Sequence, residues 1–303
     1  MLERLRQVAF MVRDLEESHE LYRRTLDMES CFTEDLSQFG LKNLVLPAGN
    51  GTFVELLQPT SADTPGGRFL ERRGEAPYLL IFESNKYEQL ITHLKSLGVR
   101  ITGETEEGGQ RSAFIHPSSA NGALLEVIES SQTHNPWPAA GTDWQSIERQ
   151  PKTRQLRQVA VLVKDLQQAI NRWGEMFGLV ATSRFQVSFT DLEIAVMPLA
   201  GGDTFIELAQ PTSGDVPSAR FLQKYGEGIY LIIYQIDDSL AVDAQLKELG
   251  VRYTSSRQTE NYTNLGFNSI WLHPSAMKGA FTQLSQVLVS DNPWPPAGDS
   301  WYK

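Results

Sequence analysis

LRQVAFMVRDL at Leu5 to Leu15 and LRQVAVLVKDL at Leu156 to Leu166 are nearly the same string, 151 positions apart. A longer string repeats at almost the same offset: TFVELLQPTSADTPGGRFLERRGE at Thr52 to Glu75 returns as TFIELAQPTSGDVPSARFLQKYGE at Thr204 to Glu227. Self-similarity over such a distance indicates a duplicated structural unit, and missing it would misassign the whole fold. The sequence therefore predicts a tandem duplication of one domain.

The later motifs keep their order in both copies. LKSLGVR from Leu94 matches LKELGVR from Leu246, and NPWPAAGTDW from Asn135 matches NPWPPAGDSW from Asn292. The offset grows from 152 to 157, which indicates a five-residue insertion in the second copy, within the polar stretch RQTENYTNLGFN. We expect two tandem domains at residues 1–131 and 156–303, separated by a tail and linker at 132–155.

Each copy shows strand-like alternation and helical periodicity in a regular order. A strand over Gln7 to Val12 precedes Asp14, which is placed to cap a helix with the sequence LEESHELYRRTL. Strands at Leu41 to Pro47 and Thr52 to Leu57 and a loop with Pro59, Pro65, Gly66 and Gly67 come next. The remaining elements are a strand at Tyr78 to Phe82, a helix at Tyr87 to Leu97, and strands at Val99 to Thr102, Ser112 to His116 and Ala123 to Ile128. The pattern predicts an α+β fold of four β-α-β-β-β modules in curved, mixed sheets.

Composition and charge exclude several classes of function. Lys and Arg total 27 against 37 Asp and Glu, a formal charge of −10. A protein that binds nucleic acid normally gathers a basic patch, and this chain has no long Lys or Arg run. No stretch approaches the roughly 18 apolar residues of a membrane span, and the start has no secretion signal. With Cys31 as the one cysteine, expected to be inert, we predict a cytoplasmic protein without nucleic-acid or membrane partners.

Five strings, in order and twice over, resemble the vicinal oxygen chelate superfamily, which includes glyoxalase I, bleomycin-resistance proteins, extradiol dioxygenases and methylmalonyl-CoA epimerase. In the first copy they are QVAFMVRDLEESHELYRRTLDM, GTFVELLQP, RFLERRGEAPYLLIF, LKSLGVRI and AFIHPSSANGALLEVIE. Their order and spacing look most like a methylmalonyl-CoA epimerase or glyoxalase I type domain. The resemblance implies tandem glyoxalase-like domains whose modules curl around a cleft, where four strand positions hold a divalent metal.

The four metal positions of the family carry over to Gln7, Glu55, Leu79 and Glu126 in the first copy, and to Gln158, Glu207, Leu231 and Gln283 in the second. Leucine has no lone pair to donate, and it stands in both copies where the family normally has histidine. The five histidines lie elsewhere in the sequence, at His19, His93, His116, His134 and His273. We therefore expect no metal or other cofactor. If a metal is held, its ligands are Gln7, Glu55 and Glu126, or Gln158, Glu207 and Glu126.

Glu55 and Glu126 stand in apolar strands, where alternation turns them to the same side as core residues. Burying a carboxylate is costly, and two of them in a dry cleft raise one pKa, which suits acid–base work. We expect Glu126 and Glu55 to be catalytic; the alternative is that they hydrogen-bond Gln7 and the tyrosines as the remnant of a metal site. If modules pair within a copy, Gln7, Glu55 and Glu126 converge, and if they pair between copies, Glu126 joins Gln158 and Glu207.

Further residues are expected to contact substrate. Gln7 and Tyr78 would orient a substrate oxygen, and Arg68, like its counterpart Arg220, would clamp a carboxylate or phosphate unless it forms a surface ion pair. The corresponding set in the second copy is Gln158, Glu207, Tyr230 and Gln283. The tails carry Trp137, Trp144, Trp294 and Trp301, which are expected to cover an open sheet edge, with an aromatic flap as the alternative.

These residues support three hypotheses about function. The first is an isomerase, epimerase or lyase that moves a proton next to a carbonyl or carboxyl group of a small, partly apolar organic molecule, without the usual metal. The second is a non-catalytic binding protein of the bleomycin-resistance type. A metal-dependent, ring-cleaving dioxygenase matches the length but requires two histidine ligands that this sequence does not offer. Either a monomer or a homodimer is compatible with the sequence.

Overall fold

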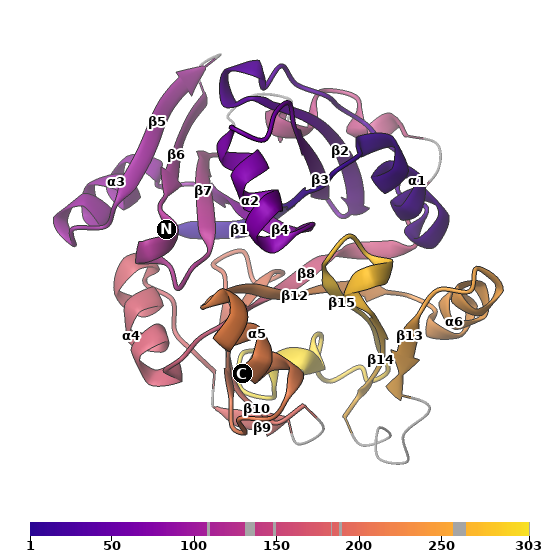
Figure 1. The fold of residues 1–303 in the computed structure, drawn as a ribbon. Helices are drawn as coiled ribbons and strands as arrows, with labels where there is room; N and C mark the ends of the chain where they lie inside the picture. The colour runs from indigo at the N-terminus through magenta and orange to yellow at the C-terminus, as the bar shows by residue number, and fades with distance from the viewer. Residues whose placement is uncertain are drawn as a thin grey trace.

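A computed structural model of the protein describes residues 1–107, 110–130, 137–147, 150–182, 184–187, 190–256 and 265–302. It contains one seven-stranded and one eight-stranded sheet (Figure 1). The first sheet has the strand order β2-β3-β1-β4-β7-β6-β5 and the second the order β13-β14-β15-β12-β8-β11-β10-β9. Each sheet is built from one copy of the repeat, and the predicted α+β architecture is confirmed.

The elements follow one another in the same order in both copies, except that the second copy has one additional strand, β9. The first copy contains β1 (Leu2–Met11), α1 (Leu15–Leu26), β2 (Leu41–Gly49), β3 (Thr52–Pro59), α2 (Pro65–Arg73), β4 (Ala76–Ser84), α3 (Tyr87–Ser96), β5 (Ile101–Glu107), β6 (Gln110–Ile115) and β7 (Leu124–Glu129). The second contains β8 (Thr153–Leu162), α4 (Leu166–Phe177), β9 (Phe185–Val187), β10 (Leu192–Pro198), β11 (Phe205–Pro211), α5 (Pro217–Tyr225), β12 (Gly228–Ile236), α6 (Ser239–Glu248), β13 (Tyr253–Ser255), β14 (Phe267–Leu272) and β15 (Phe281–Val287).

The two modules of each copy pair with each other rather than with the other copy. β1 pairs in parallel with β3 and antiparallel with β4, and β8 pairs in the same way with β11 and β12. Of the two pairings left open by the sequence, the one within a copy is therefore correct. Glu126 shares a sheet with Gln7 and Glu55, and the conditional set of Gln158, Glu207 and Glu126 is not brought together.

Local sequence signals explain where the first helix of each copy begins. The Asp14 side chain accepts a hydrogen bond from the backbone N–H of Glu17 (2.8 Å), and Asp165 accepts one from Gln168 (2.9 Å). An N-cap of this kind satisfies one of the free N–H groups in the first turn. The predicted start and end of α1 agree with the structure, because capping and periodicity indicate the same residues.

The expected loop after the third strand is instead a helix, α2, with α5 as its equivalent. Thr64 caps α2 by accepting a hydrogen bond from the N–H of Gly67 (3.0 Å), and Pro65 occupies the first turn, where its missing N–H costs nothing. A Cβ on Gly66 would lie 2.9 Å from the Cε atom of Met11. Gly66 therefore allows this helix to pack closely on β1, and Gly67 allows the backbone of Ser61 and Ala62 to approach the helix, although glycines in this number are typical of a loop.

The first module departs from the predicted pattern in one place. Between α1 and β2 the chain makes a single bridge, Phe32 to Val45, at the position where the second copy has the strand β9. Gly141 lies against Phe32 here, as Gly298 lies against Phe185 of β9 in the second copy, so the contact with the tail does not explain the missing strand. One of the four modules is thus reduced by a strand among the described residues.

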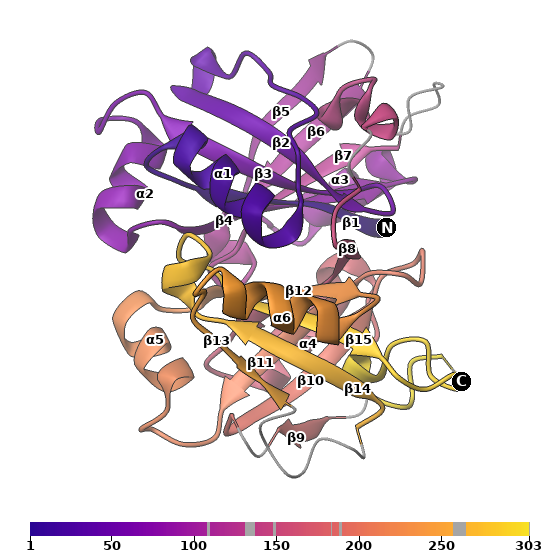
Figure 2. The ribbon, with the colours of Figure 1, turned by 90° about the vertical axis from the view of Figure 1, so that its right-hand side faces the viewer.

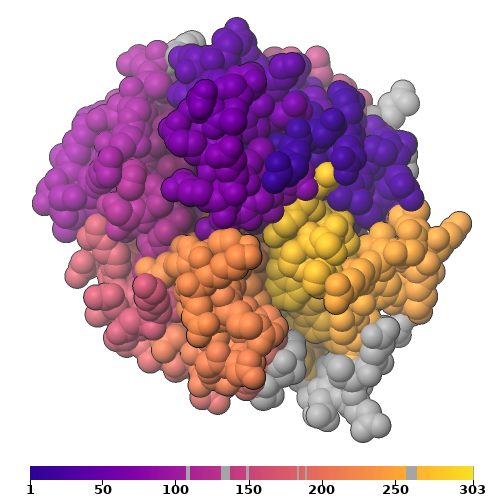
Figure 3. Space-filling view, viewed as in Figure 1, coloured from indigo at the N-terminus to yellow at the C-terminus, as the bar shows by residue number. Residues whose placement is uncertain are grey.

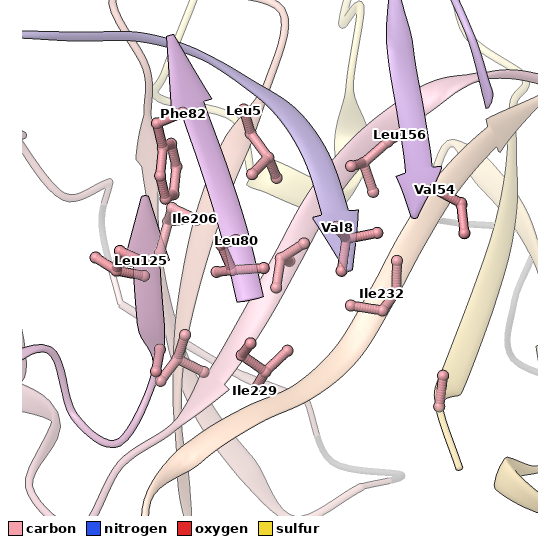
Figure 4. Packing of buried hydrophobic residues seen from close by; sticks show 14 of the residues in the cluster. Leu5, Val8, Val54, Leu80, Phe82, Leu125, Leu156, Ile206, Ile229 and Ile232 are labelled. Carbon is pink, nitrogen blue, oxygen red and sulfur yellow. The ribbon is translucent and has the colours of Figure 1, made fainter. Parts of the chain in front are cut away.

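The two sheets pack against each other through one continuous apolar core, called the central core here (Figure 2). Figure 4 shows its side chains meeting from both copies; it labels Leu5, Val8, Val54, Leu80, Phe82 and Leu125 from the first copy and Leu156, Ile206, Ile229 and Ile232 from the second. The two halves meet along a continuous boundary on the face drawn in Figure 3. Because they share this core, each half depends on the other for burial of its apolar surface.

Two reciprocal hydrogen bonds tie the halves together inside the central core. The N–H of Leu5 donates to Thr204 Oγ1 (2.9 Å), and the N–H of Leu156 donates to Thr52 Oγ1 (2.8 Å). The opposite face of each sheet is called the tail-covered face, because the segment after the last strand folds over it. Its apolar members include Ala9, Phe53, Leu79, Ile81 and Trp137 in the first copy and Ala160, Phe205, Leu231, Ile233 and Trp294 in the second.

Candidate functional site

Glu55 lies on the tail-covered face of the first copy and is held by two amide groups. Gln7 Nε2 donates to one carboxyl oxygen (2.8 Å) and Asn43 Nδ2 donates to the other (2.7 Å). The side chain is 6% exposed, and burial raises the pKa of Glu55, while the two hydrogen bonds act in the opposite direction. The Glu55 carboxyl group is therefore shielded from solvent, and hydrogen bonds hold both of its oxygens.

Glu126 lies on β7, beside Ile81 of β4 and Phe114 of β6. It is half-buried, and burial raises the pKa of Glu126 to about 8. The Ser112 hydroxyl hydrogen-bonds the carboxyl and acts against this rise, and the carboxyls of Glu55 and Glu34 add to it by repulsion. At neutral pH Glu126 thus carries a proton in most molecules while solvent still reaches it.

The second copy repeats the buried pair with one partner fewer. Gln158 Nε2 donates to Glu207 Oε2 (2.6 Å), and Glu207 is 5% exposed. Ile194 stands in β10 at the register position that Asn43 has in β2, so the second amide donor is replaced by an apolar side chain. Burial raises the pKa of Glu207 to about 7.

Gln283, the counterpart of Glu126, is bonded through its whole amide group. Its oxygen accepts a hydrogen bond from Trp271 Nε1 (3.0 Å), and its Nε2 donates to Ser269 Oγ (3.0 Å) and Ser285 Oγ (2.9 Å). A neutral amide in such a network has no proton to transfer near neutral pH. The two halves therefore differ at this position. The first half has Glu126, a titratable carboxyl group that solvent reaches, and the second half has the amide Gln283.

The tail tryptophans form a structural cover, as expected, but they cover the tail-covered faces and not an open sheet edge. Trp137 and Trp294 are fully buried, and their indole N–H groups donate to Gln7 Oε1 (3.1 Å) and Gln158 Oε1 (2.8 Å). Two further tail residues stack edge-on against strand phenylalanines: Trp144 on Phe53 and Trp301 on Phe205, with ring centres 5.2 and 4.8 Å apart. The sequence places these residues in the tail, but no local pattern in it indicates their contact with the glutamines.

Tyr78 and Tyr230 stand at β-bulges, where the register with β1 and β8 shifts by one residue. Tyr78 packs against Phe69 and Tyr230 against Phe221, with ring centres 5.0 and 5.2 Å apart. Both are half-buried, and burial raises the pKa of each phenol. In the described part of the chain no hydrogen bond joins Tyr78 to Glu55 or Glu126, or Tyr230 to Glu207. The predicted hydrogen bonds between the tyrosines and the glutamates are therefore not formed.

The two arginines expected to clamp an anion are on the surface. Arg68 donates to the backbone oxygen of Asp63, and Arg220 forms an ion pair with Asp215 (2.8 Å). Both side chains are exposed, on α2 and α5. Both arginines therefore make surface interactions, which was the alternative that the sequence left open.

The histidines and the cysteine that the structure describes have other roles. His116 and His273 accept hydrogen bonds at the start of short turns, His93 contacts the backbone oxygen of Glu175, and His19 lies 3.9 Å from Glu29. His134 lies outside the described residues. Burial raises the pKa of Cys31 to about 12, which leaves the thiol unreactive near neutral pH.

The residues present do not fit the divalent metal that the resemblance implies. Gln7 Oε1 and Gln158 Oε1, the atoms that would face a metal, accept hydrogen bonds from indole groups. Leu79 and Leu231 offer no lone pair. Among the residues that the structure describes, no three His, Cys, Asp or Glu side chains are grouped as a metal would require.

Asn43 is the site residue that the sequence analysis missed although a signal was present. It stands in the strand LKNLVLP at an alternating position with Leu41 and Val45, which both belong to the tail-covered face. A polar side chain at such a position needs a partner, and here the partner is Glu55. Alternation alone would have placed Asn43 on the same face as Leu41 and Val45.

A family model described as the Glyoxalase/Bleomycin resistance protein/Dioxygenase superfamily matches residues 6–115 and 157–267. The ethylmalonyl-CoA/methylmalonyl-CoA epimerase of Cereibacter sphaeroides is 31% identical over 132 residues, which are 42% of this chain and 98% of that protein. The mitochondrial methylmalonyl-CoA epimerase of Bos taurus is 30% identical over 133 residues, 43% of this chain and 75% of its own. These relatives each correspond to about one half of the chain.

A solved structure resembles the whole chain rather than one half. A mutant of 4-hydroxymandelate synthase from Streptomyces coelicolor superimposes with a TM-score of 0.75 at 17% identity, covering 97% of this chain and 95% of that one. At this identity the likeness concerns the fold, and it extends to the arrangement of both halves. In the described part of the chain no helix is long and apolar enough to cross a membrane.

Proposed function

We propose, since the chain belongs to the Glyoxalase/Bleomycin resistance protein/Dioxygenase superfamily, that its first half acts on a small organic molecule and that Glu126 moves a proton next to a carbonyl or carboxyl group of that molecule. One observation carries the proposal. Glu126 is half-buried with its pKa raised to about 8, and the equivalent position in the second half is the amide Gln283.

The environment of Glu126 suits this role. A general acid or base works best when its pKa lies near the working pH, because both protonation states are then accessible. Protonated Glu126 donates to a ligand oxygen and, after losing its proton, accepts one from the neighbouring carbon. Ser112 orients the carboxyl, and the half-buried ring of Phe114 offers an apolar wall for the ligand.

Glu55 has a supporting role in the proposed reaction. Gln7 and Asn43 fix both of its oxygens, so its position does not depend on a ligand. Its negative charge repels a second negative charge on Glu126 and so favours the protonated form of Glu126. We propose that no divalent metal takes part, because the donor atoms described above do not fit one.

The proposal is tested by hydrogen exchange at the carbon next to a carbonyl. Methylmalonyl-CoA and ethylmalonyl-CoA, the compounds in the names of the relatives, are incubated with the protein in D2O, and deuterium uptake is followed by mass spectrometry. Uptake is expected with the wild-type protein and is expected to fall at least about 100-fold in Glu126→Gln. Glu207→Gln is the matched control, in which uptake is expected to stay within about twofold of wild type. Unchanged uptake in Glu126→Gln would remove the role assigned to this residue.

A second candidate function is binding without turnover, as in a sequestering protein. The observation in its favour is the sealing of Glu55, which leaves Glu126 without a second solvent-accessible carboxyl partner. In this case the same CoA esters would raise the melting temperature of the wild-type protein while remaining unlabelled in D2O. Deuterium uptake that depends on Glu126 would exclude this candidate.

A further inference from the structure

The two tails repeat one short motif, WPAAG at 137–141 and WPPAG at 294–298. Trp137 has φ −150° and ψ 82°, and Trp294 has φ −153° and ψ 79°. In each tail the following proline opens a short 3-10 turn, and a glycine with φ of 75° or 81° ends it. The ring of proline restricts φ at the start of the turn, and glycine permits the positive φ at its end. The two similar motifs thus adopt the same backbone conformation, which indicates that the motif specifies this conformation.

Each motif places an indole at the same point of a hydrogen-bond chain. Trp137 donates to Gln7 Oε1, and the other end of that amide donates to Glu55. In the second half, Trp294 donates to Gln158, which donates to Glu207. Because an indole N–H only donates, it fixes which end of each glutamine amide faces the glutamate.

A guanidinium group also lies over the face of each indole ring. The guanidinium of Arg6 lies over the Trp137 ring at 4.8 Å and is itself bonded to Glu83 (3.3 Å). Arg157 lies over the Trp294 ring at 5.3 Å. A cation over an indole face is attracted by the ring, and the attraction is greater where water is excluded.

The leucines at the third family position fit this arrangement. Leu79 belongs to the same apolar cluster as Trp137, and Leu231 belongs to the same cluster as Trp294. An imidazole at either position would bring a polar ring into an apolar cluster, at a cost unless it found a partner. The leucine and the tryptophan therefore occur together in both halves.

We propose that Trp137 and Trp294 are positioning residues that replace the metal of this fold family as the partner of the first-strand glutamine. Each indole N–H satisfies the glutamine oxygen that a cation would otherwise take, and each ring closes the tail-covered face to divalent cations. The glutamine–glutamate pair is thereby held in one orientation without a metal. This inference concerns both halves and stands independently of proton transfer by Glu126.

The first test introduces a histidine, the metal ligand typical of this family, at position 231 of the second half. It asks whether Trp294 still excludes a cation. Leu231→His is compared with Leu231→His combined with Trp294→Ala, and each is dialysed against Co2+ and followed by visible absorption and metal analysis. No stoichiometric cobalt is expected in the single variant, and about one ion per chain is expected in the double variant. Stoichiometric cobalt in the single variant, or none in a folded double variant, would overturn the proposal.

The second test measures the wild-type chain, and substituted variants serve only to assign its signals. The indole N–H groups are labelled with 15N, and the signals of Trp137 and Trp294 are assigned by Trp→Phe substitution. Both are expected to exchange with solvent more slowly than the signal of Trp144, which is half-buried, and to stay sharp when paramagnetic Co2+ is added. Selective broadening of the two signals by stoichiometric Co2+ would show that a cation reaches the glutamines, and the proposal would be wrong.

A third comparison isolates the hydrogen bond from the ring. Trp137→Phe removes the N–H that Gln7 accepts and keeps an aromatic ring, whereas Trp144→Phe removes an indole that packs edge-on against Phe53. A melting temperature lower by about 2 to 4 °C is expected for Trp137→Phe and a smaller change for Trp144→Phe. Equal changes would show that the Trp137 hydrogen bond does not position the glutamine.

Discussion

Replacing Glu126 by glutamine is expected to change how the stability of the protein depends on pH. In the folded protein burial raises the pKa of Glu126 to about 8, whereas the ordinary value of this carboxyl is 4.5. Between these values the folded state binds more protons than the unfolded state, so the free energy of unfolding falls as the pH rises. The contribution is fully present below about pH 4.5 and is lost by the time the pH has passed about 8. Glutamine does not titrate, and the variant lacks this dependence.

The size of the effect follows from the two pKa values. One pKa unit corresponds to about 1.4 kcal/mol, so the interval from 4.5 to about 8 corresponds to about 5 kcal/mol. Solvent reaches the half-buried side chain and reduces the penalty of ionisation. We therefore expect Glu126→Gln to be more stable than wild type by about 2 to 5 kcal/mol near pH 9, and close to wild type near pH 5.

Urea unfolding of both proteins near pH 5, 7 and 9 measures this difference. Glu129→Gln is the matched control on the same strand, because the Arg111 guanidinium lowers the pKa of Glu129 and its removal has the opposite sign. That control is expected to lose a similar amount of stability at all three pH values, because the ion pair is present throughout this range and is lost only as the pH falls below the ordinary value of 4.5. Parallel stability curves for wild type and Glu126→Gln from pH 5 to 9 would refute a raised pKa at Glu126.

Further predictions concern the tail and the central core. Gly141→Ala is expected to lower the free energy of unfolding by about 2 to 4 kcal/mol, because φ is +75° and a Cβ would lie 2.6 Å from Phe32. Gly74→Ala, with φ +77° and open space around it, is expected to cost about 1 kcal/mol, and equal losses in urea unfolding would contradict a packing role for Gly141. Thr52→Val removes the acceptor of the Leu156 N–H and is expected to cost about 1 to 3 kcal/mol, whereas a neutral effect would show that the bond between the halves contributes little.

Much of the fold could be predicted from the repeat, because the same strings must fold in the same way in both copies. The capped helix α1 agrees with the structure at both ends, since Asp14 and the apolar periodicity carry independent information. The helix α2 was missed because Gly66 and Pro65 are typical of loops, and the packing of Gly66 against Met11 depends on tertiary contact. Which modules pair was also open, since local sequence does not specify long-range strand partners.

The candidate site could be predicted only in part. Glu55 and Gln7 were both identified and are hydrogen-bonded. Alternation correctly turned Glu55 to the side of core residues, and Gln7 was indicated by the resemblance to the family. The contact of Trp137 with Gln7 joins residues 130 positions apart, and no local pattern indicates it. Arg68 and Tyr78 were expected to contact substrate; that role stays a prediction, and the structure places Arg68 on the surface and Tyr78 against Phe69.

The central claim, that Glu126 carries the proton of a site in the first half, is tested most directly by its own titration. Glutamate side chains are labelled with 13C at the carboxyl carbon, and wild type is compared by NMR with Glu126→Gln across the pH range. The signal absent from the variant is expected to titrate near pH 8 in the wild-type protein. If that signal titrates near the ordinary value of 4.5, Glu126 is ionised at neutral pH and the account of the site is wrong.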